Sequence, residues 1–150
     1  MAGMPRAHMD HAARVAEQIG RILQGHKIRG EQRLDRLRGG MFAVCWTAQS
    51  GDVFLELSIS HDGEDGSADY LAVLLRIDHP DDPERTLQQF KLLLVLHTST
   101  WHSSTAGQLG FALDAQPNLT ETVAMEAVDR LARWFSDPHR QTPLLPEGAQ

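Results

Sequence analysis

Histidines are the side chains in this sequence with the most obvious chemical potential. There are eight of them, beside a single cysteine. His97 and His102 bracket serines and threonines in the run "HTSTWHSST", where a hydroxyl nucleophile and an imidazole base could meet. His8 and His11 lie three residues apart near the start of the chain. Catalytic, metal-binding and purely structural roles are therefore the alternatives to weigh.

The spacing of these residues argues against chemistry. Neither histidine pair has the spacing of a closed zinc site, and the chain holds no Gly-x-Ser-x-Gly nucleophile motif. The acidic loops "HDGEDGSAD" and "DHPDDPE" do not follow the calcium-loop pattern. Serine and threonine hydroxyls also serve the backbone groups that become free where a helix ends. We therefore expect no catalytic residue, no metal site and no cofactor, and we expect Cys45 to be a small buried residue.

Length and composition are typical of one globular domain. The chain has 150 residues, of which 41% are hydrophobic and 23% charged. We expect residues 1–150 to form a single domain, with disordered tails at residues 1–8 and 139–150. A lone cysteine, no signal-peptide pattern and no apolar run near the ~20 residues that span a bilayer predict a cytoplasmic protein without membrane contact.

Charge is unevenly distributed along the chain. The net charge is −6, yet residues 1–40 hold eight of the fourteen basic residues and only four of the twenty acidic ones. A basic surface could contact nucleic acid, but domains that bind nucleic acid are usually basic overall. We expect no nucleic-acid partner. A solvated basic helix is the favoured interpretation of this segment, and a contact with an acidic partner is the alternative.

Hydrophobic periodicity predicts a helix followed by a meander of strands. Apolar residues recur at helical spacing over residues 10–24, and "EQRLDRLR" indicates a weak short helix. Alternating or β-rich runs predict strands over residues 41–47, 52–60 and 70–78. Short links between neighbouring strands indicate antiparallel pairing.

The segment "DDPERTLQQFKLLLVL" has the features of a second long helix. Asp82 suits the N-cap, Pro83 the first helical position, and Glu84 the positive end of the helix dipole. The run Leu92–Leu96 makes this helix apolar nearly all round, so two of its sides must be buried. We expect the protein's own sheet on one side and a second subunit on the other.

The rest of the chain predicts one more strand and a final helix. The strand covers residues 108–114, and the helix covers residues 119–135 with Asn118 as its cap. A further strand within residues 118–125 is the alternative. The fold class is therefore α+β, a twisted antiparallel sheet with helices packed against it. The predicted element order is α-(α)-β-β-β-α-β-(β)-α, where parentheses mark uncertain elements.

This order resembles the class I type III secretion chaperones, the Tir-chaperone family. The stretches that carry the resemblance are "FLELSI", "LAVLLRID", "DDPERTLQQFKLLLVL" and "AGQLGFALDAQ", and it covers roughly residues 10–136. The basic segment before the first strand and the insertion Trp101–Thr105 depart from the family pattern. The resemblance implies a cytoplasmic homodimer without enzymatic activity. Such a dimer binds the N-terminal segment of a secreted effector and keeps it soluble and competent for export.

The resemblance also implies two sets of interface residues. Contact with the effector is expected from Trp46, Val53, Phe54 and Leu55. The dimer interface is expected to contain Phe90, Leu93, Leu94, His97 and Trp101. One alternative is a regulatory or protein-interaction domain of the same fold, similar to YbjN. Another is a small ligand-binding domain or enzyme that uses the His97–His102 region.

Overall fold

The computed structural model describes residues 5–36, 42–62, 68–79, 81–106 and 116–139. Along the chain, one helix comes first, seven strands follow, and a second helix comes last. The helices are α1 (Arg6–Gly25) and α2 (Glu121–Ser136). The strands are β1 (Glu31–Arg36), β2 (Phe42–Ser50), β3 (Val53–Asp62), β4 (Ala68–His79), β5 (Asp82–Val95), β6 (Thr100–Ala106) and β7 (Gln116–Leu119).

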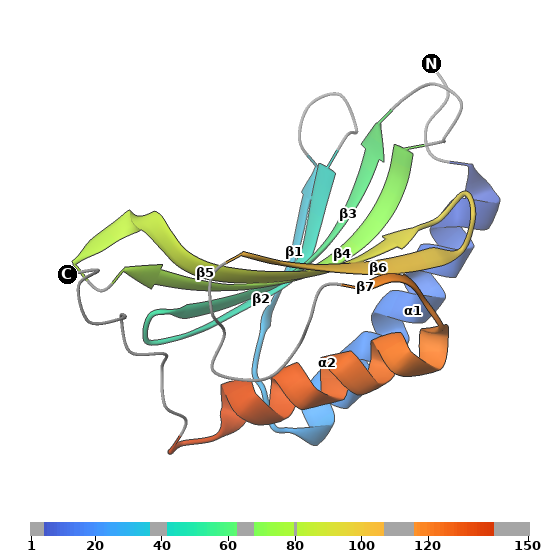
Figure 1. Cartoon of the computed structure of the whole chain (residues 1–150). Coiled ribbons are helices and arrows are strands. Elements are labelled where there is room, and N and C mark those ends of the chain that lie inside the picture. Colours follow the sequence, from blue (N-terminus) through green and yellow to red (C-terminus); the bar gives the residue numbers. More distant parts are fainter. Residues whose placement is uncertain (1–4, 37–41, 63–67, 80, 107–115, 140–150) are drawn as a thin grey trace.

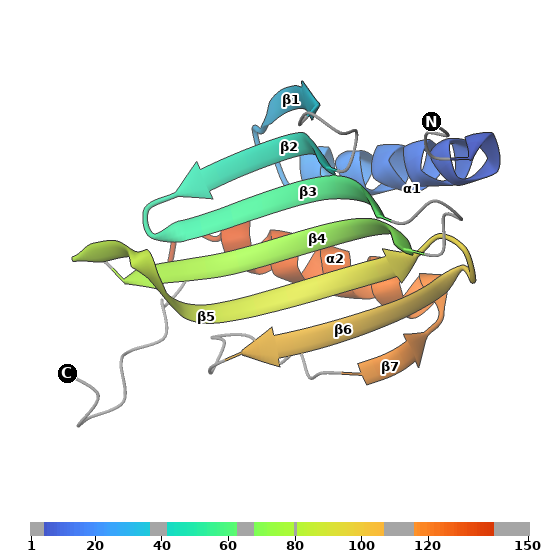
Figure 2. The same cartoon turned by 90° about the horizontal axis from the view of Figure 1, so that it is seen from above.

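The seven strands form one antiparallel sheet. Each strand pairs with the next one in sequence, so the spatial order is β1-β2-β3-β4-β5-β6-β7. Figure 2 shows both helices behind the sheet, and in Figure 1 α2 lies below it while α1 descends from its right-hand end, so the two helices are on the same face. The predicted α+β class, an antiparallel sheet with helices packed against it, is confirmed. The detailed order of elements differs from the prediction.

The two helices follow the predicted periodicity. The buried residues of α1 are Ala12, Val15, Ile19 and Leu23, three or four positions apart. Helix α2 begins one residue after Thr120, whose side chain accepts a hydrogen bond from the amide of Val123 at 3.2 Å. The cap is therefore Thr120 and not Asn118, which has a φ of 57°.

The first meander strands also agree with their sequence patterns. Strands β2 and β3 pair down to Ser50 and Val53, and Gly51 in the turn between them has a φ of 60°, a conformation that suits glycine. Strand β4 buries Leu71, Val73, Leu75 and Ile77, which are the alternating residues that the sequence predicted on one face.

The predicted helix over residues 82–96 is wrong, because this segment is strand β5. Asp82 pairs with His79 across a hairpin and does not cap a helix. Phe90, Leu92 and Leu94 point into the core, while Leu93 and Val95 between them are only half-buried. A short, fully apolar run fits either structure, because its periodicity alone cannot separate a buried helix from a strand. Long-range pairing with β4 and β6 decides for the strand.

Other differences concern the ends and the uncertain elements. The weak helix predicted from "EQRLDRLR" is the edge strand β1, and α1 begins at Arg6 inside the tail that was expected to be disordered. The alternative strand within residues 118–125 is wrong, because residues 121–125 belong to α2. The short strand β7 covers Gln116–Leu119 and ends before them. The strand predicted over residues 108–114 and the tail from residue 140 lie outside the described residues.

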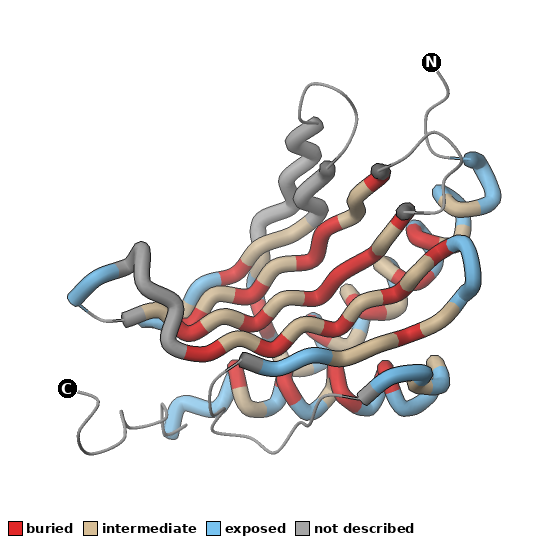
Figure 3. Tube along the Cα trace, turned by 45° about the horizontal axis from the view of Figure 1, so that its top comes forward, coloured by how far each residue is buried: buried red, intermediate tan, exposed pale blue. Residues whose placement is uncertain are grey.

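A single apolar core lies between the sheet and the two helices. Figure 3 shows the pattern, with buried residues alternating along the central strands and lining the inner sides of the helices. The largest fully buried side chains include Trp101, Phe90, Ile19, Leu55 and Leu131, which come from both helices and three strands. The core therefore fixes the sheet against the helices, and no described helix packs on the opposite sheet face.

Candidate functional site

The sheet face opposite the helices is here called the uncovered face, because neither α1 nor α2 lies in front of it (Figure 2). Its side chains alternate with the core residues and meet in rows across the strands. Half-buried apolar or aromatic residues on this face come from three adjacent strands. They are Phe54 on β3, Tyr70 and Leu74 on β4, and Leu93 and Val95 on β5.

Two small residues lie at the middle of the uncovered face. Ser58 and Ala72 face each other across β3 and β4, and Leu93 follows Ala72 across β5. Ser58 is 6% exposed and Ala72 9%, although no described helix covers them. Leu74 and Leu93 on the same face are half-buried, so part of each side chain is exposed to solvent.

Charged groups lie beside these apolar side chains. Glu56 is opposite Leu74, which in turn is opposite Lys91. The guanidinium of Arg76 lies 4.6 Å from the ring centroid of Phe54 and donates a 2.9 Å hydrogen bond to Asp78. Burial raises the pKa of Glu56, and Arg76 and Lys91 oppose this shift. The uncovered face therefore combines apolar contact area with charges of both signs.

The predicted effector-contact residues are divided between the two faces. Phe54 lies on the uncovered face, whereas Val53 and Leu55 are core residues, 0% and 1% exposed. Trp46 is half-buried and packs against the core from the helix-covered side. Alternation along β3 makes this division unavoidable, because neighbouring residues of a strand point to opposite faces. Val53 and Leu55 are therefore not available to a partner.

The predicted dimer residues are divided in the same way. Phe90, Leu94 and Trp101 are at most 2% exposed within one chain, so they are part of its core and not of a subunit interface. Leu93 reaches the uncovered face, and His97 is exposed in the turn between β5 and β6. The error has a physical cause, because the expected interface was the second side of a helix that does not exist.

The run "HTSTWHSST" contains a hairpin turn and the start of β6. Val95 pairs with Thr100, and Ser99 in the turn has a φ of 53°. The hydroxyl of Thr100 lies 2.7 Å from that of Thr98 and 3.3 Å from its carbonyl oxygen. The hydroxyls of Thr98 and Thr100 therefore form hydrogen bonds within the turn between β5 and β6. His102 lies on β6 opposite Leu93, and its Nδ1 accepts a 3.5 Å hydrogen bond from the amide of Asn118.

Histidines do converge at another place, around the carboxylate of Asp69. This side chain is fully buried, and it accepts hydrogen bonds from Nδ1 of His8 at 2.6 Å and from Nδ1 of His61. The ring of His97 meets that of His8 edge-on, with centroids 6.1 Å apart. These residues come from α1, β3, β4 and the β5–β6 turn, so the cluster fastens the start of α1 to one end of the sheet. His97 and His102, proposed together as a site, are therefore in different environments.

The contacts of the histidine cluster around Asp69 join α1 to the sheet, which is a structural role. Within the described parts of the chain, no three side chains of histidine, cysteine, aspartate or glutamate are placed to hold a metal ion. Next to the cluster, burial and then Arg14 lower the pKa of His11, so its imidazole is mainly neutral at pH 7.

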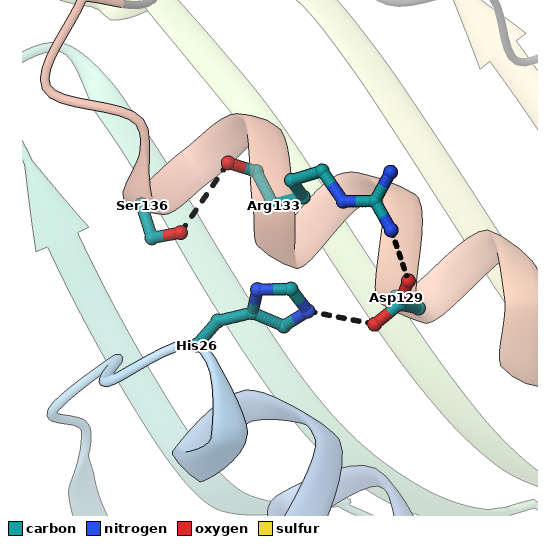
Figure 4. A network of polar contacts seen from close by, with 4 residues as sticks. All are labelled: His26, Asp129, Arg133 and Ser136. Atoms are coloured by element: carbon teal, nitrogen blue, oxygen red, sulfur yellow. Dashed lines mark hydrogen bonds and ion pairs between the residues drawn. The ribbon is translucent and has the colours of Figure 1, made fainter.

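A second polar network joins the two helices (Figure 4). His26, just after α1, donates from Nε2 to Asp129 of α2 at 2.7 Å, and Arg133 donates to the other carboxylate oxygen at 2.9 Å. The Ser136 hydroxyl donates to the Arg133 carbonyl oxygen at 3.3 Å. The hydrogen bond from His26 holds the pKa of Asp129 below its usual range. This network fixes the two helices on the covered face.

Comparison of the chain with protein-family models, with curated proteins and with solved structures finds no match. Among the described helices, none has the length and apolar character that crossing a membrane requires. The assignment of a function therefore depends on the geometry of the chain itself.

Sequence reasoning missed two sets of residues. Tyr70, Leu74 and Arg76 of the uncovered face could have been found, because the alternation of "YLAVLLRID" already places them opposite the core residues. The pairing of His8 and His61 with Asp69 could not, because His8 and Asp69 are 61 residues apart and only the folded sheet brings them together.

Proposed function

We propose that this chain is a partner-binding protein without catalytic chemistry, which holds an extended segment of another polypeptide against the uncovered face. The observation that supports this most directly is the group of half-buried apolar side chains on that face, from Phe54 to Val95, which no described helix covers. Exposed apolar area bordered by polar groups is typical of protein interaction sites.

A chaperone for the N-terminal segment of a secreted effector is the more specific form of this proposal. It is supported by the first helix, the antiparallel meander and the final helix, which the family resemblance implied. It does not extend to the family's dimer helix, whose place is taken by β5. Any homodimer would use other surfaces, and Leu93 is the member of the predicted interface set that the uncovered face offers.

Strand edges offer a second source of affinity for an extended segment. The outer strands of the sheet are β1 and β7, with six and four residues, whereas their neighbours β2 and β6 have nine and seven. A segment that adds to a sheet edge gains backbone hydrogen bonds, while side-chain contacts supply its specificity. Apolar side chains of the bound segment would then reach the uncovered face.

The test is a selection of random twelve-residue peptides displayed on phage against the full-length protein. We expect binders whose affinity falls at least tenfold in the variant Leu74→Lys/Leu93→Lys, because both substitutions place charge in the apolar part of the uncovered face. Val123→Lys is the matched control, since Val123 is 42% exposed on α2 and lies away from that face. The proposal fails if no peptide is enriched, or if the enriched peptides bind the double variant as well as the wild type.

A further inference from the structure

A glycine in the middle of α1 has no explanation within this chain. Gly20 occupies the helix interior, where glycine is less stable than alanine because it loses more backbone freedom. A Cβ atom at residue 20 would have no heavy atom within 4 Å, so close packing does not require glycine. Its φ is not positive either, since Gly51 is the positive-φ glycine among the described residues. The space beside Gly20 is therefore open to something outside the chain.

This space is part of a cleft between α1 and the sheet. The cleft has a volume of about 400 Å³, and its apolar lining comes from Ala16, Gly20 and Leu23 on the helix and from Trp46 and Leu57 on the strands. The two small helix residues lie on the same side of α1, four positions apart, and they leave room in front of the indole. A volume of this size is within the range of small ligand sites.

The indole of Trp46 forms one wall of the cleft. Gly30 packs so closely against it that a Cβ at residue 30 would fall 1.6 Å from the ring atom Cε2. The ring is therefore held from the Gly30 side, and it is half-buried. An aromatic surface beside small residues is a favourable contact for one inserted apolar side chain, as in the anchor pockets of protein interfaces.

Two exposed cations precede Gly30, the residue that packs against Trp46 of the cleft. Lys27 and Arg29 are both exposed, and they lie in the link between α1 and Gly30. Arg21 is at the cleft itself, where it pairs with Glu17 at 2.6 Å. Residues 5–30, which form α1 and the link after it, contain five basic and two acidic residues. An acidic segment would be attracted to this part of the surface and repelled by the rest.

We propose that this cleft, lined by Ala16, Gly20, Leu23, Trp46 and Leu57, receives one apolar side chain from an acidic segment of a partner protein. The cleft is on the helix-covered side of the sheet, so it is separate from the uncovered face. The inference therefore does not depend on the function proposed above, and each can fail without the other.

The probe is the peptide acetyl-Glu-Asp-Phe-Glu-Asp-amide, titrated into the 15N-labelled full-length protein. The indole N–H resonance of Trp46 is assigned by comparison with Trp46→Phe. We expect this resonance to shift with a millimolar or tighter dissociation constant, and at least tenfold more weakly with two matched peptides. In one the phenylalanine is replaced by alanine, and in the other the acidic residues are replaced by lysine. No shift with the acidic phenylalanine peptide, or equal shifts with all three, would overturn the proposal.

Gly20→Leu separates binding from folding. The leucine enters open space and improves helix propensity, so the thermal midpoint should rise by about 3 °C, while the peptide affinity should fall at least tenfold. Gly25→Ala is the matched control, because this second α1 glycine also has open space but does not line the cleft. It should bind the peptide like the wild type. A folded Gly20→Leu variant that binds the peptide as tightly as the wild type contradicts the proposal.

A charge-reversal variant covers the case in which Gly20→Leu fails to fold. Lys27→Glu changes an exposed residue, and it should weaken binding of the acidic peptide several-fold with no change in the thermal midpoint. Unchanged affinity in this variant would count against the acidic partner. A concentration-dependent shift of the Trp46 resonance without peptide would show that a second copy of this chain fills the cleft, which would also overturn the proposal.

Discussion

At the scale of single residues, the surroundings of a carboxyl group favour either its charged or its neutral form, and this makes the stability of the protein depend on pH. Asp129 and Glu56 are both carboxylates outside the core, and their environments move their pKa values in opposite directions. Asp129 accepts hydrogen bonds that favour its charged form, whereas Glu56 loses part of its hydration among apolar neighbours. Their contributions to stability should therefore depend on pH with opposite signs.

Asp129→Asn should destabilise the protein by about 0.5–1 kcal/mol at pH 7, since the interaction is largely exposed and screened by solvent. The pKa of Asp129 is lowered by its hydrogen bond from His26, so its stabilisation is present above the ordinary carboxyl pKa and is lost as pH falls through the lowered value. Urea unfolding at several pH values, with the exposed Glu126→Gln as control, measures this. A loss that stays constant at acidic pH would contradict the role of the network.

Glu56→Gln should have the opposite effect. The raised pKa of Glu56 means that its contribution to stability is fully present below the ordinary carboxyl pKa and is lost as pH rises through the raised value. The glutamine variant should therefore have a higher free energy of unfolding than the wild type at pH 7, and the gain should shrink toward pH 4. If the variant is less stable at pH 7, contacts from Glu56 to Arg76 and Lys91 outweigh the effect of burial.

At the scale of elements, the sequence correctly predicted the helices and strands whose formation depends on local sequence patterns. Helices α1 and α2 and strands β2 to β4 follow from periodicity and turn residues, because their apolar residues fit one period only. Strand β5 was mistaken for a helix, because Asp82, Pro83 and Glu84 resemble a helix start and Leu92–Leu96 is apolar throughout. Phe90 and Leu94 of the predicted dimer interface are core residues for the same reason, since the face that a residue takes depends on the period.

Substitutions at Leu92 and Leu93 test directly whether this segment is a strand or a helix. Leu92 is fully buried and Leu93 half-buried on the other face. Leu92→Ala should destabilise by about 2–5 kcal/mol through the cavity it leaves, whereas Leu93→Ala should lose less than about 1 kcal/mol. Chemical denaturation of the two variants makes the comparison, and each is the other's control. Similar losses at both positions would fit a helix buried on two sides and contradict the strand.

The attachment of α1 to the sheet is tested at Asp69. Asp69→Ala leaves the donors of His8 and His61 without their shared acceptor, so we expect a loss of about 2–4 kcal/mol. Hydrogen exchange should also become faster in the first turns of α1 than in α2. Asp10→Ala, an exposed carboxylate on α1 whose pair with Arg6 is 3.9 Å long, should change stability by less than about 0.5 kcal/mol. Equal losses in the two variants would show that the cluster does not fasten the helix.

The whole molecule has two different sides. The covered side is closed by α1, α2 and their polar links, and it contains the core that Trp101 helps to fill. The uncovered face presents partly exposed apolar side chains with charges of both signs among them. The sequence predicted no catalytic residue, and its family resemblance implied a protein that binds a segment of another polypeptide. It could not say which of those residues remain accessible, because that depends on how strands from distant parts of the chain are paired.

The central claim is that the uncovered face is the binding surface, and chemical-shift mapping tests it most directly. A peptide selected against the wild-type protein is titrated into the 15N-labelled chain, and the backbone amide shifts are followed. We predict that the largest shifts cluster at Tyr70, Leu74, Leu93 and their neighbours on β3 to β5. Shifts confined to the outer surfaces of α1 and α2, with the amides of β3 to β5 unchanged, would contradict the account.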